Sequence, residues 1–171
     1  LFWHDHFATS NAKVNNLAAM RRQNETFRKL GRGNFGELLG AAVRDPALLA
    51  WLDAPANRKG RANENLSREL MEVFSLGVGH YTERDIREAA RAFTGYDYDW
   101  NRRRYLWNPD NHDAGVKTIF GHRGRFGPED VIELCLRHPA HAPYLMAKLW
   151  SYFVPSTPSA AMLKRLVRSY R

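Results

Sequence analysis

The sequence has a single cysteine among its 171 residues, so no disulfide can form within the chain. That residue, Cys135, lies in an apolar pattern of helical spacing over residues 131–136, which predicts a core position rather than a nucleophile. No apolar run approaches the roughly 18 residues that a membrane-spanning helix needs. The Gly-x-Ser-x-Gly and His-Glu-x-x-His patterns are also missing, which removes the usual signatures of serine hydrolases and zinc proteases.

Apolar residues are abundant enough for one hydrophobic core. They make up 44% of the chain and include nine Phe, seven Tyr and five Trp. The length predicts a single helical domain over residues 1–171. The chain opens on Leu1-Phe2-Trp3 without an initiator Met and stops within a helical pattern over residues 162–171. We therefore expect a fragment of a longer protein, truncated at both termini.

Positive charge dominates, with a net charge of +8 and a pI near 9.9. This balance favours anionic partners such as acidic polysaccharide, lipid headgroups or nucleic acid. A second interpretation is that the arginines form salt bridges within the chain, since many lie in helices at suitable spacings.

Helix start signals recur along the sequence and predict a mainly α fold, a multi-helix orthogonal bundle of roughly seven helices. A first long helix is predicted over residues 11–30. The later start signals are Asn34, Asp45-Pro46, Thr82 with Asp85, and Pro128. His141 is expected to cap the following helix or to face solvent. The predicted core contains Leu66, Leu70, Val73, Phe74, Ile86, Phe93, Leu134, Leu149 and Phe153.

Residues 96–126 alternate in polarity with the period of a β-strand and predict a small β-hairpin insertion. The insertion combines aromatic side chains with a predicted anion-binding set: Arg102, Arg103, Arg104, Arg123 and Arg125. Such a mixture suits stacking on sugars or bases. An alternative interpretation is a rigid lid over the helical core.

Glu69 stands out within residues 63–95, the stretch around which the chain is organised. On a helical wheel it lies about 60° from Leu66, inside the apolar arc. A carboxylate aimed at the core must be paired, hydrogen-bonded, protonated or bound to a metal. We expect Glu69 to be buried and partnered by Arg91 or a histidine. A structural ion pair and a catalytic or ligand role both fit this pattern.

Histidines supply the remaining candidates for chemistry. His4 and His6 would point roughly 200° apart on a helix and to one side on a strand. With Glu69 and His112 they form a candidate site for a divalent transition metal. Glu69, His112 and Asp113 are the candidate catalytic residues.

Several motifs in order carry a family resemblance. They are Phe2-Trp3-His4-Asp5-His6-Phe7-Ala8-Thr9, Asp45-Pro46-Ala47, Arg68-Glu69-Leu70-Met71-Glu72-Val73-Phe74-Ser75-Leu76-Gly77, Glu88-Ala89-Ala90-Arg91-Ala92-Phe93-Thr94-Gly95, His112-Asp113, and Lys148-Leu149-Trp150. In these the chain resembles a bacterial family catalogued as domain of unknown function 1800. The resemblance implies a longer exported protein in a periplasmic or extracellular location.

Three functional hypotheses follow. The first is a non-catalytic binding or assembly module whose basic surface meets an anionic polysaccharide or a membrane surface. The second is a metal- or acid/base-dependent enzyme that uses the His/Glu cluster. The third is nucleic-acid binding, which an exported location disfavours and which no known module pattern supports.

Overall fold

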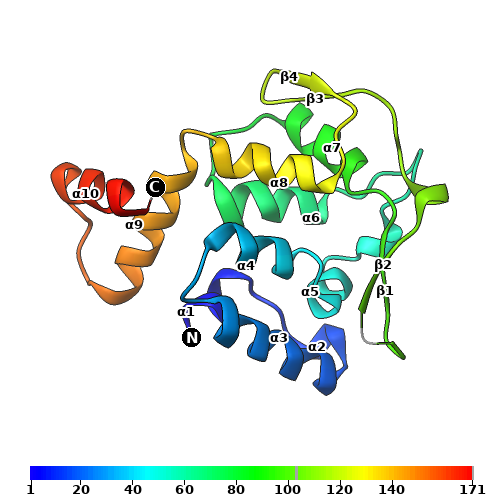
Figure 1. Ribbon diagram of the computed structural model, residues 1–171, viewed down its shortest axis with the longest axis horizontal. Helices are drawn as coiled ribbons and strands as arrows, with labels where there is room; N and C mark the ends of the chain where they lie inside the picture. The colour runs from blue at the N-terminus through cyan, green and yellow to red at the C-terminus, as the bar shows by residue number, and fades with distance from the viewer. Residues whose placement is uncertain (103, 171) are drawn as a thin grey trace.

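The chain is mainly α in a computed structural model that describes residues 1–102 and 104–170 (Figure 1). Arg103, one of the predicted anion-binding residues, lies outside the described residues. The helices are α1 Phe2–His6, α2 Asn11–Val14, α3 Leu17–Leu30, α4 Phe35–Ala42, α5 Pro46–Trp51, α6 Asn65–Glu69, α7 Glu83–Ala92, α8 Pro128–Arg137, α9 His141–Phe153 and α10 Ala160–Tyr170. A π-helical segment, Leu70–Ser75, continues α6, and short 3-10 turns cover Ala54–Ala56 and Pro109–Asn111.

Side-chain caps start α4, α5 and α7 where the sequence predicts them. The Asn34 side chain accepts from the Glu37 amide at 3.1 Å at the start of α4. At the start of α7, Thr82 and Asp85 exchange hydrogen bonds in a capping box, with Asp85 Oδ2 accepting from the Thr82 amide at 2.8 Å. These caps satisfy amides that have no acceptor within the helix.

Two neighbouring asparagines interrupt the helix predicted over residues 11–30. Asn15 adopts a left-handed conformation at φ 47°, and this ends α2. Asn16 then caps α3, its side chain accepting from the Ala19 amide at 3.0 Å. The single predicted helix was therefore wrong, because asparagine tolerates left-handed geometry and also makes a good N-cap.

The insertion contains two β-hairpins in separate two-stranded antiparallel sheets. Strand β1 (Tyr96–Asp99) pairs with β2 (Arg104–Trp107), and β3 (Lys117–Ile119) pairs with β4 (His122–Gly124). Figure 1 places the β3–β4 hairpin above α7 and strands β1 and β2 lower, at the right-hand edge. The predicted hairpin is present, and a second one follows it.

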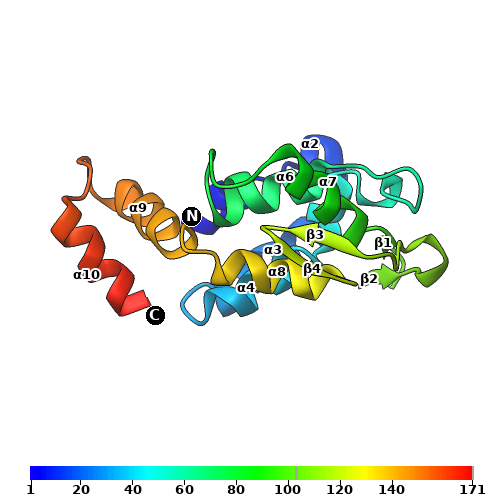
Figure 2. The ribbon, with the colours of Figure 1, turned by 90° about the horizontal axis from the view of Figure 1, so that it is seen from above.

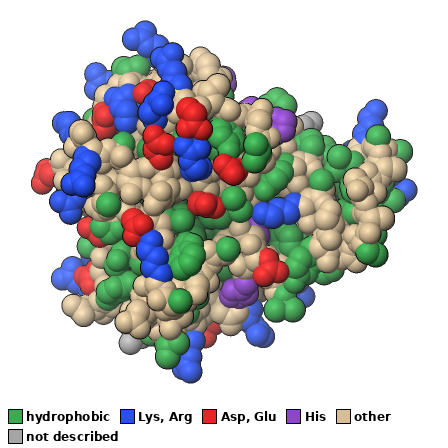
Figure 3. Space-filling view, turned by 180° about the vertical axis from the view of Figure 1, so that it is seen from behind, with side chains coloured by type: hydrophobic (Ala, Val, Ile, Leu, Met, Phe, Trp, Pro, Cys, Tyr) green, Lys and Arg blue, Asp and Glu red, His purple; other side chains and the backbone are tan. Residues whose placement is uncertain are grey.

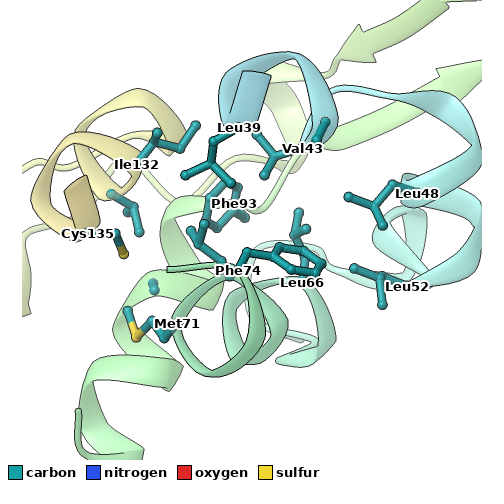
Figure 4. Packing of buried hydrophobic residues seen from close by; sticks show 14 of the residues in the cluster. Leu39, Val43, Leu48, Leu52, Leu66, Met71, Phe74, Phe93, Ile132 and Cys135 are labelled. Atoms are coloured by element: carbon teal, nitrogen blue, oxygen red, sulfur yellow. The ribbon is translucent and has the colours of Figure 1, made fainter. Parts of the chain in front are cut away.

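We call α6 and the π segment together, residues 65–75, the central helix. The core lies where α4, α5, the central helix, α7 and α8 meet (Figure 4). Cys135 is fully buried there, and burial raises the pKa of its thiol to about 12. Of the predicted core residues, five are buried: Leu66, Leu70, Phe74, Ile86 and Phe93. Three others are half-buried: Val73, Leu134 and Leu149. Phe153 is 71% exposed, so that prediction was wrong.

Helices α9 and α10 project from the rest of the molecule, which explains the exposed Phe153 (Figures 1 and 2). Helix α10 packs mainly on α9, and none of its described residues is fully buried. Within residues 1–102 and 104–170, no helix is long and apolar enough to cross a membrane.

Candidate functional site at the end of the central helix

The central helix changes from α to π geometry immediately after Glu69. The Leu76 amide donates to the carbonyl of Met71, five residues earlier, at 2.9 Å. The Ser75 hydroxyl donates to the Leu70 carbonyl within the same turn. π-helical turns are rare and occur often at functional sites. The wider turn changes which side chains share a face and leaves carbonyls free for other donors.

Two histidines donate to successive carbonyls at this helix end. His6 Nε2 lies 3.1 Å from the Phe74 oxygen, and His141 Nδ1 lies 2.9 Å from the Ser75 oxygen. A carbonyl can only accept, so each of these nitrogens carries the proton. Burial lowers the pKa of His6 to about 3 and also lowers that of His141. Both rings are therefore neutral at pH 7, and His141 is buried rather than solvent-facing.

The Val73 carbonyl takes two further donors from α9. Tyr144 Oη donates to it at 2.8 Å and Lys148 Nζ at 2.9 Å. Burial lowers the pKa of Lys148, while the nearby Glu69 carboxylate opposes that effect. Side chains of α1 and α9 thus satisfy the last three carbonyls of the π segment.

Glu69 differs from its prediction in burial and in partner. It is half-buried, and its carboxylate makes no hydrogen bond or ion pair with any residue that the structure describes. Burial raises its pKa first, the neighbouring Glu72 adds to this, and Lys148 opposes it. Glu72 itself accepts from Tyr81 Oη at 2.6 Å. The wheel placed Glu69 near the apolar face, but the start of the π segment places it beside Lys148.

Arg91, the expected partner of Glu69, forms a different network. Its Nε donates to Asp113 at 2.7 Å, and its Nη1 contacts both oxygens of Glu88 at 3.0 Å. The Arg91 guanidinium holds the pKa of Asp113 below its ordinary value. His112 donates through Nδ1 to the Thr94 carbonyl at 2.9 Å. Asp113 and His112 therefore fix the connection between the two hairpins.

Carboxylates on α7 also accept from the backbone around β3, which sequence reasoning missed. Glu88 accepts from the Thr118 amide at 2.9 Å, and Asp85 accepts from the Phe120 amide at 2.7 Å. The two acids lie three residues apart on one helix face, and the two amides lie two residues apart, one in β3 and one in the turn that follows it. Helix α7 thus supplies hydrogen-bond acceptors along the edge of β3 that does not pair with β4.

The four predicted metal ligands are not brought together. His4 Nε2 lies 2.9 Å from the Asn24 side chain, His6 is in the core, and His112 bonds Thr94. Because α1 is helical, His4 and His6 point apart. Among the described residues, no group of three His, Cys, Asp or Glu side chains is placed to hold a metal ion.

The four described arginines of the predicted anion-binding set divide between the two hairpins. Arg102 follows β1 and lies 3.8 Å from Asp99, and Arg104 begins β2. Arg123 and Arg125 are exposed in and just after β4. The hairpins lie at different edges of the molecule, so these arginines form no single compact patch (Figure 1).

Most of the basic side chains that the structure describes have no acidic partner within 4 Å. Arg103 and Arg171 are not described; of the other 24 Lys and Arg side chains, six lie within 4 Å of a carboxylate. Fifteen of the remaining eighteen are exposed. On the face in Figure 3, Lys and Arg side chains are spread over the main body and are interspersed with acidic side chains. Salt bridges within the chain therefore involve some of the described arginines, and most of the described cations lie outside them.

Comparison with known proteins gives one match. The model of a family described as "Protein of unknown function (DUF1800)" matches residues 1–171, the whole chain. No curated protein and no solved structure matches it.

Proposed function

Because the chain belongs to the DUF1800 family, whose name records no activity, its role must be inferred from its own side chains, and we propose a non-catalytic binding module for an anionic polymer. The observation that carries this proposal is the set of fifteen exposed cations that have no carboxylate within 4 Å among the described residues. Such charges raise the local concentration of a polyanion and release its counterions on contact.

The distribution of the cations favours a polymer over a small anion. A small anion needs donors that converge on one point, as in a bidentate arginine site. Here Arg104 and Arg123 lie on different hairpins at different edges of the molecule. A long chain of repeating negative charges contacts separated cations together. We take the polymer to be an acidic polysaccharide, which suits the exported location that the family resemblance implies.

Pairing of the arginines provides a matched test of this proposal. Arg123 is exposed and has no acidic partner in the part of the chain that the structure describes, whereas Arg137 is exposed and pairs with Glu133. Arg123→Gln and Arg137→Gln each remove one positive charge. We expect Arg123→Gln to weaken binding of an acidic polysaccharide by about two- to fivefold and Arg137→Gln to have a smaller effect.

Affinity measured by calorimetry on the 171-residue chain distinguishes the outcomes. A neutral polysaccharide should not bind in the same buffer. Equal losses for the two variants, or equal binding of neutral and acidic polymers, would contradict the proposal. Binding to anionic vesicles without binding to the polysaccharide would replace the polymer by a membrane surface.

A second candidate function is acid–base chemistry at Glu69. The specific observation that favours it is a half-buried carboxyl group whose pKa is raised by burial and by Glu72. A general acid near neutral pH requires such a shift. Metal-dependent chemistry by His4, His6, Glu69 and His112 has no comparable support, since these side chains lie apart.

A further inference from the structure

A cavity of about 550 Å³ lies between α4 and the projecting helices α9 and α10. Its walls are more apolar than polar and come from six parts of the chain. They include Trp3 of α1, Phe35 of α4, Leu136 of α8, and Leu145, Met146 and Leu149 of α9. Cavities of this size and character are typical of sites for small organic ligands.

Hydrogen bonds and packing hold the walls in place. Trp3 Nε1 donates to the Gly31 carbonyl at 2.8 Å, and a Cβ on Gly31 would lie 2.4 Å from that nitrogen. On the opposite side, Tyr170 Oη lies 2.7 Å from His141 Nε2. His141 in turn stacks on Phe35 at 5.4 Å between ring centroids. The cavity is therefore formed before any ligand enters, which lowers the entropic cost of binding.

Arg32 gives the cavity one charged end. It lines the cavity from the loop between α3 and α4, is exposed, and has no carboxylate within 4 Å among the described residues. Among the residues that the structure describes, no acidic side chain lines the cavity. A complementary ligand has an apolar body and a single negative charge at one end.

We propose that this cavity binds a linear alkyl carboxylate, with its chain between α4 and α9 and its carboxylate at Arg32. This ligand is different in class from the anionic polymer, and Arg32 is the one described cavity residue that is also among the fifteen exposed cations. Either proposal can therefore fail without the other.

Chain length provides the first test. Calorimetric titration uses octanoate, decanoate, dodecanoate and tetradecanoate on the 171-residue chain, all below their micellar concentrations. Each added methylene should raise the affinity about fourfold until the chain fills the cavity, after which the gain should stop. Saturable binding with this plateau supports the proposal. An absence of saturable binding by every acid, or an affinity independent of chain length, overturns it.

Matched variants locate the binding site. Leu149→Trp or Met146→Trp places an indole in the cavity and should weaken dodecanoate about tenfold or more, because the added ring occupies the ligand's space. Ser151→Trp, on the exposed side of the same helix, is the control. Circular dichroism checks that each variant folds. Unchanged affinity in folded forms of both cavity variants overturns the site.

Two arginine variants and two ligands test the charged end of the cavity. Arg32→Ala should weaken dodecanoate about fivefold and leave dodecanol unchanged. Arg28→Ala, which removes an exposed arginine of α3 outside the cavity lining, should change neither. Equal affinities of dodecanoate and dodecanol for the unaltered chain overturn the assignment of an anionic ligand.

Discussion

His6 is a buried neutral histidine whose state couples stability to pH. Its pKa is about 3 in the folded protein, whereas the ordinary value for a histidine side chain is 6.5. The unfolded chain therefore binds a proton between these values while the folded chain does not. The contribution of this residue to the free energy of unfolding is fully present above pH 6.5. It decreases as pH falls toward 3, by on the order of 4 kcal/mol.

His6→Gln tests this coupling, since the amide can still donate to the Phe74 carbonyl. Chemical denaturation at pH 7 and pH 4 should give a smaller difference for the variant than for the unaltered chain. His122→Gln, an exposed position in β4, is the control and should behave like the unaltered chain. An equal pH dependence in the His6 variant would show that the ring is not the titrating group.

The pKa shift of Glu69 should change stability with pH in the opposite direction. Burial and Glu72 raise its folded pKa, so the folded chain binds the proton more tightly and this contribution to stability falls as pH rises through that pKa. Glu69→Gln removes the charge at nearly constant shape. We expect unchanged or slightly higher stability at pH 7, by denaturant titration. A loss above about 2 kcal/mol would instead indicate a structural ion pair.

The end of the π segment depends on donors from another helix. Tyr144 and Lys148 both donate to the Val73 carbonyl. Tyr144→Phe and Lys148→Met should each cost about 1 kcal/mol, because one donor remains. The double variant should lose more than the sum, since the carbonyl then has no donor. Strict additivity in a double-mutant cycle would contradict this account.

Helix α7 holds β3 through carboxylates. Glu88→Ala removes the acceptor of the Thr118 amide and a partner of Arg91. We expect a loss of about 2–3 kcal/mol and faster hydrogen exchange at the Thr118 amide. Glu133→Ala on α8, which removes an exposed pair with Arg137, should change neither by much. Slow exchange at Thr118 in the Glu88 variant would argue against this contact.

At the scale of elements, helix caps could be predicted from neighbouring residues in the sequence. Features that depend on contacts between distant residues could not. The caps at Asn34 and Thr82 depend on residues three positions away, so the sequence contains the whole signal. The π segment after Glu69 depends on His6 and His141, which lie 68 and 66 residues from their acceptors. A helical wheel assumes α geometry throughout and cannot include these contacts.

The same limit applies to the whole molecule. A mainly α chain with one core followed from helical periodicity, but Phe153 was assigned to the core because the wheel cannot show that α9 projects from the body. Grouping His4, His6, Glu69 and His112 required a tertiary arrangement that composition does not determine. The contacts that His141 and Lys148 make were missed because nothing local distinguishes them.

The salt dependence of polymer binding tests the central claim most directly. Affinity of the 171-residue chain for an acidic polysaccharide is measured across a series of sodium chloride concentrations. The proposal predicts a straight line of negative slope between the logarithms of affinity and salt concentration, corresponding to release of several counterions. A slope near zero, or no binding at low salt, would show that the exposed arginines do not bind a polyanion.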